Sequence, residues 1–390
     1  MRFPEFTGEW SVKSISDLAN VIGGGTPDTT IKSYWNGNIQ WFTPSEIGKT
    51  KYVELSLRTI TLEGLNNSNA KLLPPYTILL SSRATVGECS IALQECATNQ
   101  GFQSLIAKNC DIDFLYYLIQ TKKKDLIRKA CGSTFLEISA NEIRKIHTNV
   151  PSNAEQKKIG ALLSLIDKRI ETQNKIIEKY ESLIQAMCDT LISKEEQQVM
   201  LSFSDFGQSY SGLSGKNAED FGDGYPFITY MNVYQNQIID LTDVGLVKIN
   251  ETEQQSVVRY GDILLTLSSE TPEEVGMGAV YLGETYPLYL NSFCFGIHIT
   301  DESKIYPPFL AYYVSSQSFR KAVYPLAQGS TRFNLLKSDF MKKKFSFPVI
   351  EKQRKIYSIL KTYSDKLIVE KLIMRLLCNQ KCYLLCQLFI

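Results

Sequence analysis

An internal repeat constrains this chain more than any other feature of its sequence. The stretch GSTFLEISANEIRKIHTNVP at 132–151 returns, at a constant spacing of 197 residues, as GSTRFNLLKSDFMKKKFSFP at 329–348. The Gly-Ser-Thr that opens each stretch and the proline that closes it coincide, and the register continues at Gln156 and Gln353. Solenoid repeats are roughly 20 to 50 residues long, so this spacing predicts two similar domains, each followed by the same kind of connector.

The length and composition agree with two globular domains. A chain of 390 residues can form two or three domains that each bury a core. Hydrophobic residues make up 44% and charged residues 21%, which are ordinary globular values, and no apolar run approaches the roughly 18 to 20 residues of a membrane span. The segment 1–10 lacks the layout of an export signal, and the nine cysteines show no paired spacing. We therefore expect reduced thiols, a cytoplasmic location and no membrane partner.

The connectors carry a heptad pattern. After Pro151 and Pro348, where helices can begin without losing a bonded amide, apolar residues recur at alternating steps of four and three. This spacing predicts long helices within 151–198 and 348–390, each of about 38 residues and roughly 55 Å. The predicted seam consists of Ile159, Leu163, Ile166, Ile170 and Ile177 in the first helix, and Ile356, Leu360, Tyr363, Leu367 and Met374 in the second.

Two arrangements of these helices are open from the pattern alone. If a pseudo-two-fold axis relates the two halves, the helices pair as an antiparallel coiled coil that holds the globular regions apart at opposite ends. In the alternative, each helix packs only on its own domain. The narrow stripe of two apolar positions in seven favours the coiled coil.

The regions 1–150 and 199–347 combine strand and helix signals. Short β-type runs such as NIQWFTP and YTILLSS alternate with Gly, Pro, Asn and Ser, and the amphipathic stretches DFLYYLIQTKKKDLIRKA and PPFLAYYVSSQSFRKAVY predict inserted helices. We therefore predict an α+β fold with two similar strand-rich domains separated by the two long helices.

Charge is distributed unevenly. Residues 1–150 carry 16 Lys and Arg against 14 Asp and Glu, a net charge of +2, whereas residues 201–346 carry 11 against 16, a net charge of −5. Because contacts to phosphate dominate affinity for nucleic acid, the acidic second region counts against nucleic-acid binding.

Motifs for enzyme chemistry are incomplete. LPPY at 73–76 is similar to the Asn/Asp-Pro-Pro-Tyr element of amino-group methyltransferases, but Leu73 cannot accept a hydrogen bond from a target amine. VIGGGTPD at 21–28 has neither G-x-G-x-x-G nor a following Gly-Lys-Ser/Thr, so we expect a turn and no nucleotide cradle. The sequence thus offers no catalytic residue.

Metal ligands are also sparse. The chain has two histidines, His147 and His298, and no C-x-x-C pair, so we expect no metal site. Cys378, Cys382 and Cys386 share one face of the second predicted helix, which we interpret as an apolar packing stripe.

Loops that combine aromatic with small polar residues favour a binding function. Asn, Gln, Ser, Thr, Lys and Arg are the side chains that contact bases and phosphates. For any single residue, ordinary polar surface is the alternative interpretation. The candidates for DNA binding are Thr26, Lys32, Tyr34, Trp35, Thr43, Ser45, Arg83, Asn99 and Gln100 in the first region, and Lys216, Thr229, Tyr230, Asn232, Ser268, Asn291 and Arg332 in the second.

The order of these pieces resembles a known family over the full chain. GGGTP, YWNGNIQWFTPSEI, LLPPYTILLSSRATVGE, ATNQGF, GSTFLEISANEIRKI and VPSNAEQKKIGALLSLIDKRI precede a heptad helix, and a second copy follows. The chain resembles the specificity subunit of type I restriction-modification systems. The resemblance implies target recognition domains at 1–150 and 199–347, each reading half of a split, asymmetric site in double-stranded DNA, and an antiparallel coiled coil from the two helices.

The resemblance also implies partners and a division of chemistry. Two methyltransferase subunits and the restriction/translocase subunits dock on a subunit of this family. They carry S-adenosylmethionine, ATP and Mg²⁺, so we expect no cofactor and no catalysis on this chain. The second copy has SGLSGKN and YLNSF in place of GGTP and ATNQG, as expected of domains that read different half-sites. Two alternatives remain: a DNA methyltransferase or nuclease with intrinsic activity, and a structural spacer that does not bind DNA.

Overall fold

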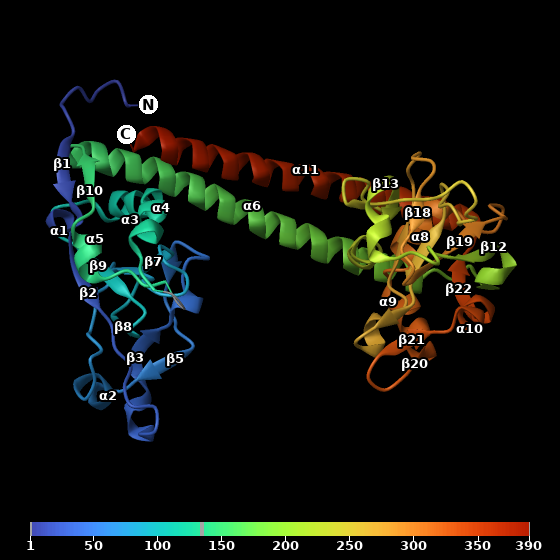
Figure 1. Ribbon diagram of the computed structural model, residues 1–390, viewed down its shortest axis with the longest axis horizontal. Helices are drawn as coiled ribbons and strands as arrows, with labels where there is room; N and C mark the ends of the chain where they lie inside the picture. The colour runs from blue at the N-terminus through green and yellow to red at the C-terminus, as the bar shows by residue number, and fades with distance from the viewer. Residues whose placement is uncertain (1, 133–135, 390) are drawn as a thin grey trace. The chain divides into compact units, whose positions relative to one another are not determined.

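The computed structural model describes residues 2–132 and 136–389 and divides into two compact units (Figure 1). Unit 1 consists of Met1–Lys175 and Leu372–Ile390, and unit 2 of Ile176–Lys371. Ser133, Thr134 and Phe135 of the first repeated stretch lie outside the described residues. Each unit contains one strand-rich region and a segment of both long helices.

Two sheets form most of the strand-rich region of unit 1. The larger has the strand order β2–β9–β6–β7–β4, the smaller has the order β5–β3–β8, and β1 pairs with β10. The strands are β1 (Ser11–Ser14), β2 (Ala19–Gly23), β3 (Trp35–Phe42), β4 (Tyr52–Val53), β5 (Arg58–Ile60), β6 (Ile78–Leu80), β7 (Cys89–Ala92), β8 (Cys96–Thr98), β9 (Gln103–Ala107) and β10 (His147–Val150). The short helices are α1 (Ile15–Leu18), η1 (Lys32–Tyr34), η2 (Pro44–Glu46), α2 (Leu62–Asn66), α3 (Ile112–Thr121), α4 (Lys123–Lys129) and α5 (Ala140–Arg144).

The continuous apolar run of β6 reflects burial on both faces. Ile78 and Leu80 belong to the core beneath α3, whereas Leu79 points into a second core on the opposite face of the sheet. All three side chains are fully buried. A strand covered on both sides needs apolar residues at every position, which is why the run does not alternate.

Unit 2 repeats this design. Its sheets have the orders β12–β19–β15–β17, β14–β13–β18 and β16–β21–β20, and β11 pairs with β22. The strands are β11 (Gln198–Ser202), β12 (Gly207–Ser211), β13 (Phe221–Ile228), β14 (Val244–Val247), β15 (Ile263–Thr266), β16 (Ser268–Ser269), β17 (Gly278–Val280), β18 (Tyr289–Leu290), β19 (Cys294–Ile299), β20 (Ala327–Gln328), β21 (Phe333–Leu335) and β22 (Lys344–Pro348). The short helices are η3 (Phe203–Asp205), η4 (Ala218–Asp220), α7 (Tyr230–Gln235), η5 (Pro272–Glu274), α8 (Pro307–Tyr313), α9 (Gln317–Val323), η6 (Tyr324–Leu326) and α10 (Lys337–Lys342).

The long helices fall inside the two predicted connector ranges. They are α6 (Asn153–Ser193) and α11 (Ile350–Leu388). A buried glutamine fixes the start of each: Gln156 Nε2 donates to the Pro151 carbonyl at 3.0 Å, and Gln353 Nε2 donates to the Pro348 carbonyl at 2.8 Å. The matching proline and glutamine of the repeat therefore have one structural explanation.

The two helices pair antiparallel, as the seam predicts. In unit 1, Ile159 and Leu163 near the start of α6 share a core with Leu384 near the end of α11. In unit 2, Ile192 at the end of α6 shares a core with Ile356 at the start of α11. Since each unit joins the start of one helix to the end of the other, the alternative in which each helix packs only on its own domain is wrong.

The burial of the predicted seam is uneven. Seam positions near the globular regions are buried, and the remaining ones are half-buried, because two helices alone cover less of each side chain. The buried set is Ile159, Leu163, Ile166, Ile356 and Leu360, and the half-buried set is Ile170, Ile177, Tyr363, Leu367 and Met374.

The three cysteines of α11 do not pack. Cys378, Cys382 and Cys386 are all exposed, so their interpretation as a packing stripe was wrong. The seam uses Leu377, Leu384 and other residues on a different face of the helix.

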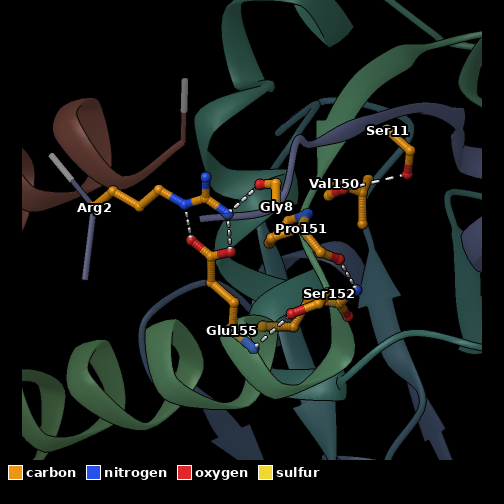
Figure 2. A network of polar contacts seen from close by, with 8 residues as sticks. Arg2, Gly8, Ser11, Val150, Pro151, Ser152 and Glu155 are labelled. Atoms are coloured by element: carbon orange, nitrogen blue, oxygen red, sulfur yellow. Dashed lines mark hydrogen bonds and ion pairs between the residues drawn. The ribbon is translucent and has the colours of Figure 1, made fainter. Parts of the chain in front are cut away.

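A polar network ties the start of the chain to the start of α6 (Figure 2). Arg2 donates from Nε and Nη2 to the two carboxylate oxygens of Glu155, both at 2.8 Å. Glu155 is 1% exposed and lies in the first turn of α6, where the helix dipole also favours a negative charge. Over residues 2–132 and 136–389, no helix is both long and apolar enough to cross a membrane.

Candidate nucleic-acid interface

The glycine run of unit 1 brings three backbone segments together. Gly25 N donates to the Thr98 carbonyl at 2.8 Å. A Cβ atom added at Gly24 would lie 2.1 Å from the Asn99 carbonyl oxygen, and one added at Gly25 would lie 2.4 Å from the Ala70 nitrogen. Only glycine permits this approach, so the run is a packing requirement.

This approach places several predicted residues in one cluster. Thr26 Oγ1 donates to Gln100 Oε1 at 2.5 Å, and both residues are exposed. Asn99 is half-buried; its Oδ1 accepts from Gly101 N at 2.8 Å, which shapes the turn that presents Gln100. Thr26, Asn99 and Gln100 thus form a surface patch of donors and acceptors, which we call the glycine-turn cluster.

The segment after β3 borders this cluster. A Cβ atom added at Gly101 would lie 2.9 Å from the Pro44 ring, so the two turns are in contact. Thr43 Oγ1 donates to Glu46 Oε2 at 2.6 Å and caps η2, whereas Ser45 remains exposed. Thr43 therefore orders the turn, and Ser45 is available to a ligand.

Two tryptophans anchor the same turn. The Trp35 and Trp41 rings meet edge to face at 5.1 Å, and their indole nitrogens donate to the Asp28 and Gly25 carbonyls, both at 3.0 Å. Trp35 is only 8% exposed, so it cannot stack on a base, and we leave it out of the proposed contacts. The Arg58 guanidinium lies 3.6 Å above the Trp35 ring. Arg58 is not predicted from the sequence, because a single arginine in VELSLRTI carries no distinguishing pattern.

The other candidates of unit 1 differ in how accessible their side chains are to a ligand. Lys32 is exposed, and Tyr34 is half-buried against the tryptophan core. Arg83 is exposed but forms an ion pair with Glu137 at 2.8 Å. The LPPY segment is a turn before β6, and Leu73 N donates to the Cys96 carbonyl at 2.7 Å, which agrees with a structural role.

Unit 2 contains a counterpart of the glycine turn, formed by SGLSGKN and YLNSF. Leu213 N donates to the Leu290 carbonyl at 2.7 Å, as Gly25 N does to Thr98 in unit 1. A Cβ atom added at Gly212 would lie 2.0 Å from the Asn291 carbonyl oxygen. Asn291 Oδ1 accepts from Phe293 N at 2.9 Å, which repeats the turn at Asn99. SGLSGKN and YLNSF therefore keep the backbone of GGGTP and ATNQG and change the side chains.

Three candidates of unit 2 stabilise a loop. Thr229 Oγ1 accepts from Asn232 N at 3.1 Å and caps α7. Asn232 is fully buried, and its Nδ2 donates to the Asp240 and Asp243 carbonyls. Since a bound duplex cannot reach this amide, we leave Asn232 out of the proposed contacts. Burial raises the pKa of Tyr230, whose hydroxyl donates to the Ser268 carbonyl at 2.8 Å.

The remaining candidates of unit 2 differ in how far their side chains are exposed. The Lys216 side chain is 5% exposed and pairs with Glu253 at 2.5 Å, so it is also left out. Ser268 is buried, Asn291 is half-buried, and Arg332 is exposed with its guanidinium 6.0 Å from the Phe293 ring. Within the described part of the chain, no group of three or more His, Cys, Asp or Glu side chains is placed to hold a metal ion.

Sequence comparison identifies a family that matches both halves of the chain. The sequence matches the family described as the type I restriction modification DNA specificity domain over residues 7–182 and 204–375. The type I restriction enzyme MjaIX specificity subunit of Methanocaldococcus jannaschii is 40% identical over 179 residues, which cover 44% of this chain and 41% of that protein. The EcoR124I/EcoR124II specificity subunit of Escherichia coli is 28% identical over 203 residues, or 47% of this chain and 50% of that protein. The chain thus spans half or less of the length of these two relatives.

Solved structures share the fold along the whole chain. A type I restriction-modification S subunit from M. genitalium aligns with a TM-score of 0.56 and 18% identity, covering 100% of this chain and 97% of that one. A chain from a structural study of complex assembly and conformational transition of the type I R-M system aligns with a TM-score of 0.64 and 14% identity, covering 99% and 98%. Because two matches to one family together cover most of the sequence, the chain belongs to the type I restriction modification DNA specificity domain family.

Proposed function

We propose that this chain is the DNA-specificity subunit of a type I restriction-modification complex, and that each strand-rich region reads one half of a split, asymmetric duplex site. The observation that carries the proposal is the conserved backbone of the two turns at Gly24 and Gly212, which present different side chains. Thr26 in unit 1 corresponds to Ser214 in unit 2, and Gln100 corresponds to Ser292. Two similar frames with different polar surfaces suit the reading of two different half-sites.

The proposed contacts are the exposed and half-buried polar groups on these frames. In unit 1 they are the glycine-turn cluster, Ser45 and Lys32, and in unit 2 they are Asn291 and Arg332. Hydrogen-bond donors and acceptors of this kind read base edges, whereas cations mainly contact phosphates.

The proposal extends to partners that carry out the chemistry. Two methyltransferase subunits would dock on the two equivalent units, and restriction/translocase subunits would complete the assembly. S-adenosylmethionine, ATP and Mg²⁺ would bind to these partners, and this chain would supply recognition alone. The net charge of −5 over residues 201–346 supports a dependence on partners, because another subunit must then supply cations to the phosphates.

Methylation-site sequencing tests the proposed function. Genomic DNA is compared between cells with and without this gene, both containing the partner subunits. We expect a split motif methylated at adenine only when the gene is present. Identical methylation in the two strains would contradict the proposal, and methyl transfer by the purified chain alone would favour an intrinsic enzyme.

A further inference from the structure

Arg58 is an exposed cation with an unusually fixed position. Arg58 is the first residue of β5, and it lies opposite Trp41 in the neighbouring antiparallel strand β3. Its guanidinium lies over the Trp35 ring, with Cζ 3.6 Å from the ring centroid. Among residues 2–132 and 136–389, none forms an ion pair with Arg58 or accepts a hydrogen bond from its side chain. Its donors are therefore directed to solvent while its ring contact restrains it.

The support beneath Arg58 is continuous with the glycine-turn cluster. Trp35 Nε1 donates to the Asp28 carbonyl and Trp41 Nε1 to the Gly25 carbonyl, both at 3.0 Å. These carbonyls flank Thr26, which donates to Gln100. A chain of direct contacts thus connects Arg58 to polar groups that we propose as DNA contacts.

Unit 2 has the same aromatic pair without the arginine. Phe221 and Phe227 occupy the positions of Trp35 and Trp41, and their rings also meet edge to face, at 5.3 Å. The residue paired with Phe227 is Gly245, where an added Cβ atom would lie 2.4 Å from the Phe227 ring. The aromatic pair is therefore part of the shared frame, and the guanidinium is an addition specific to unit 1.

We propose that Arg58 reads a guanine through the major groove in the half-site bound by unit 1, an inference that rests on the proposed function. A guanidinium presents two parallel N–H donors that match guanine O6 and N7, and no other base edge offers that pair of acceptors. Stacking on Trp35 fixes the plane of the fork before DNA binds, so less side-chain freedom is lost on binding. A phosphate contact requires only a nearby cation, which the unrestrained Lys32 already offers.

The experiment combines variants of Arg58 with modified DNA. Arg58→Lys keeps the charge and the contact with Trp35 but removes the fork, and Arg58→Met removes both. Arg128→Met is the matched control, because Arg128 is an arginine on α4 whose side chain is 77% exposed. Methylation-site sequencing of cells with each variant reports the motif. We expect Arg58→Lys to relax one guanine position in one half-site by roughly 10- to 100-fold and to leave the other half-site unchanged.

A binding measurement on the purified complex makes the test independent of activity. Each guanine of the half-site is replaced in turn by 7-deazaguanine, which lacks the N7 acceptor. For the unmodified subunit, we expect 7-deazaguanine at one position to weaken binding about 10-fold. For Arg58→Lys, we expect the same replacement at that position to cause no further loss of affinity.

The outcomes separate the two levels of the proposal. If the unmodified chain specifies no split motif, the proposed function fails, and the role of Arg58 fails with it. If a split motif appears but Arg58→Lys leaves every guanine position unchanged, only the role of Arg58 is overturned. An even loss of methylation or affinity at all sequences would also overturn it, since that result identifies a phosphate contact.

Discussion

At the scale of single residues, buried glutamines explain the matching letters at the start of the two connectors. Gln156 Oε1 accepts from Asp111 N at 3.0 Å, and Gln353 Oε1 accepts from Tyr306 N at 2.9 Å. Each amide also donates to the preceding proline carbonyl. One side chain therefore satisfies backbone groups from two segments, which no apolar residue of the same size can do.

Replacing Gln353 should destabilise unit 2. Gln353 is fully buried, and Gln353→Leu would leave the Tyr306 amide and the Lys304 and Pro348 carbonyls without their partner. We expect a loss of roughly 2 to 4 kcal/mol in the free energy of unfolding, measured by urea denaturation. The exposed Gln185→Leu on α6 is the control, with an expected change below about 0.5 kcal/mol. Equal effects of the two substitutions would show that the buried contacts contribute little.

At the scale of elements, one ion pair distinguishes the contact between α6 and α11 in unit 1 from its counterpart in unit 2. Lys381 Nζ lies 2.7 Å from Asp167 Oδ1, and Tyr117 donates to Asp167 Oδ2 at 2.6 Å. Burial and the contact with Asp167 raise the pKa of Tyr117. The positions 197 residues away from Asp167 and Lys381 hold Ser364, which accepts from Tyr312 at 2.9 Å, and the buried Ile184.

This difference predicts a compensating pair of substitutions. Lys381→Ile alone leaves the mostly buried Asp167 without its cation, so we expect a loss of roughly 2 to 3 kcal/mol in the free energy of unfolding. The double variant Asp167→Ser with Lys381→Ile places the residue types of unit 2 at these positions of unit 1. We expect its free energy of unfolding to return to within about 1 kcal/mol of the unmodified protein. Urea denaturation of both variants measures the coupling, with Lys371→Ile as the control because its pair with Glu181 is about half exposed. Additive losses would contradict this account.

The sequence predicts elements better than it predicts the binding surface. Heptad spacing depends on local periodicity, so α6, α11 and their seam follow from the sequence. Asn291, the counterpart of Asn99, lies 192 positions away, whereas the connectors are 197 apart, so the sequence places YLNSF over ATNQG but does not fix the pairing of single residues. The burial of Asn232 and Lys216 could not be predicted from the sequence, because only the folded chain brings their polar groups to Asp240, Asp243 and Glu253.

At the scale of the whole molecule, the two proposed recognition surfaces use separate cores. The glycine-turn cluster and the tryptophan pair pack on residues of unit 1 alone, and the frame at Gly212 packs on residues of unit 2 alone. A change in one surface therefore leaves the packing of the other intact, which supports independent reading of two half-sites.

Exchanging one region tests this independence. Replacing residues 1–150 with the equivalent region of a relative that keeps the apolar face toward α6 should change one half of the methylated motif. We expect the other half to stay the same, because unit 2 keeps all its own core residues. Sequencing of methylated sites gives the result, and exchange of residues 199–347 is the reciprocal control. A change in both halves after a single exchange would contradict modular reading.

The closure of unit 1 by the end of α11 has a consequence for how the protein is made. Leu384 and Leu388 complete the core that Ile166 and the preceding elements begin, although 218 positions separate Ile166 from Leu384. At about 5 to 20 residues per second, a ribosome needs roughly 10 to 40 s to synthesise that interval. The nascent first half must therefore wait with an open apolar face on α6 until the end of α11 has been synthesised. A product released before that point would keep this face exposed to chaperones and proteases, so the same contact that closes the core also allows the cell to distinguish chains that contain α11 from chains that lack it.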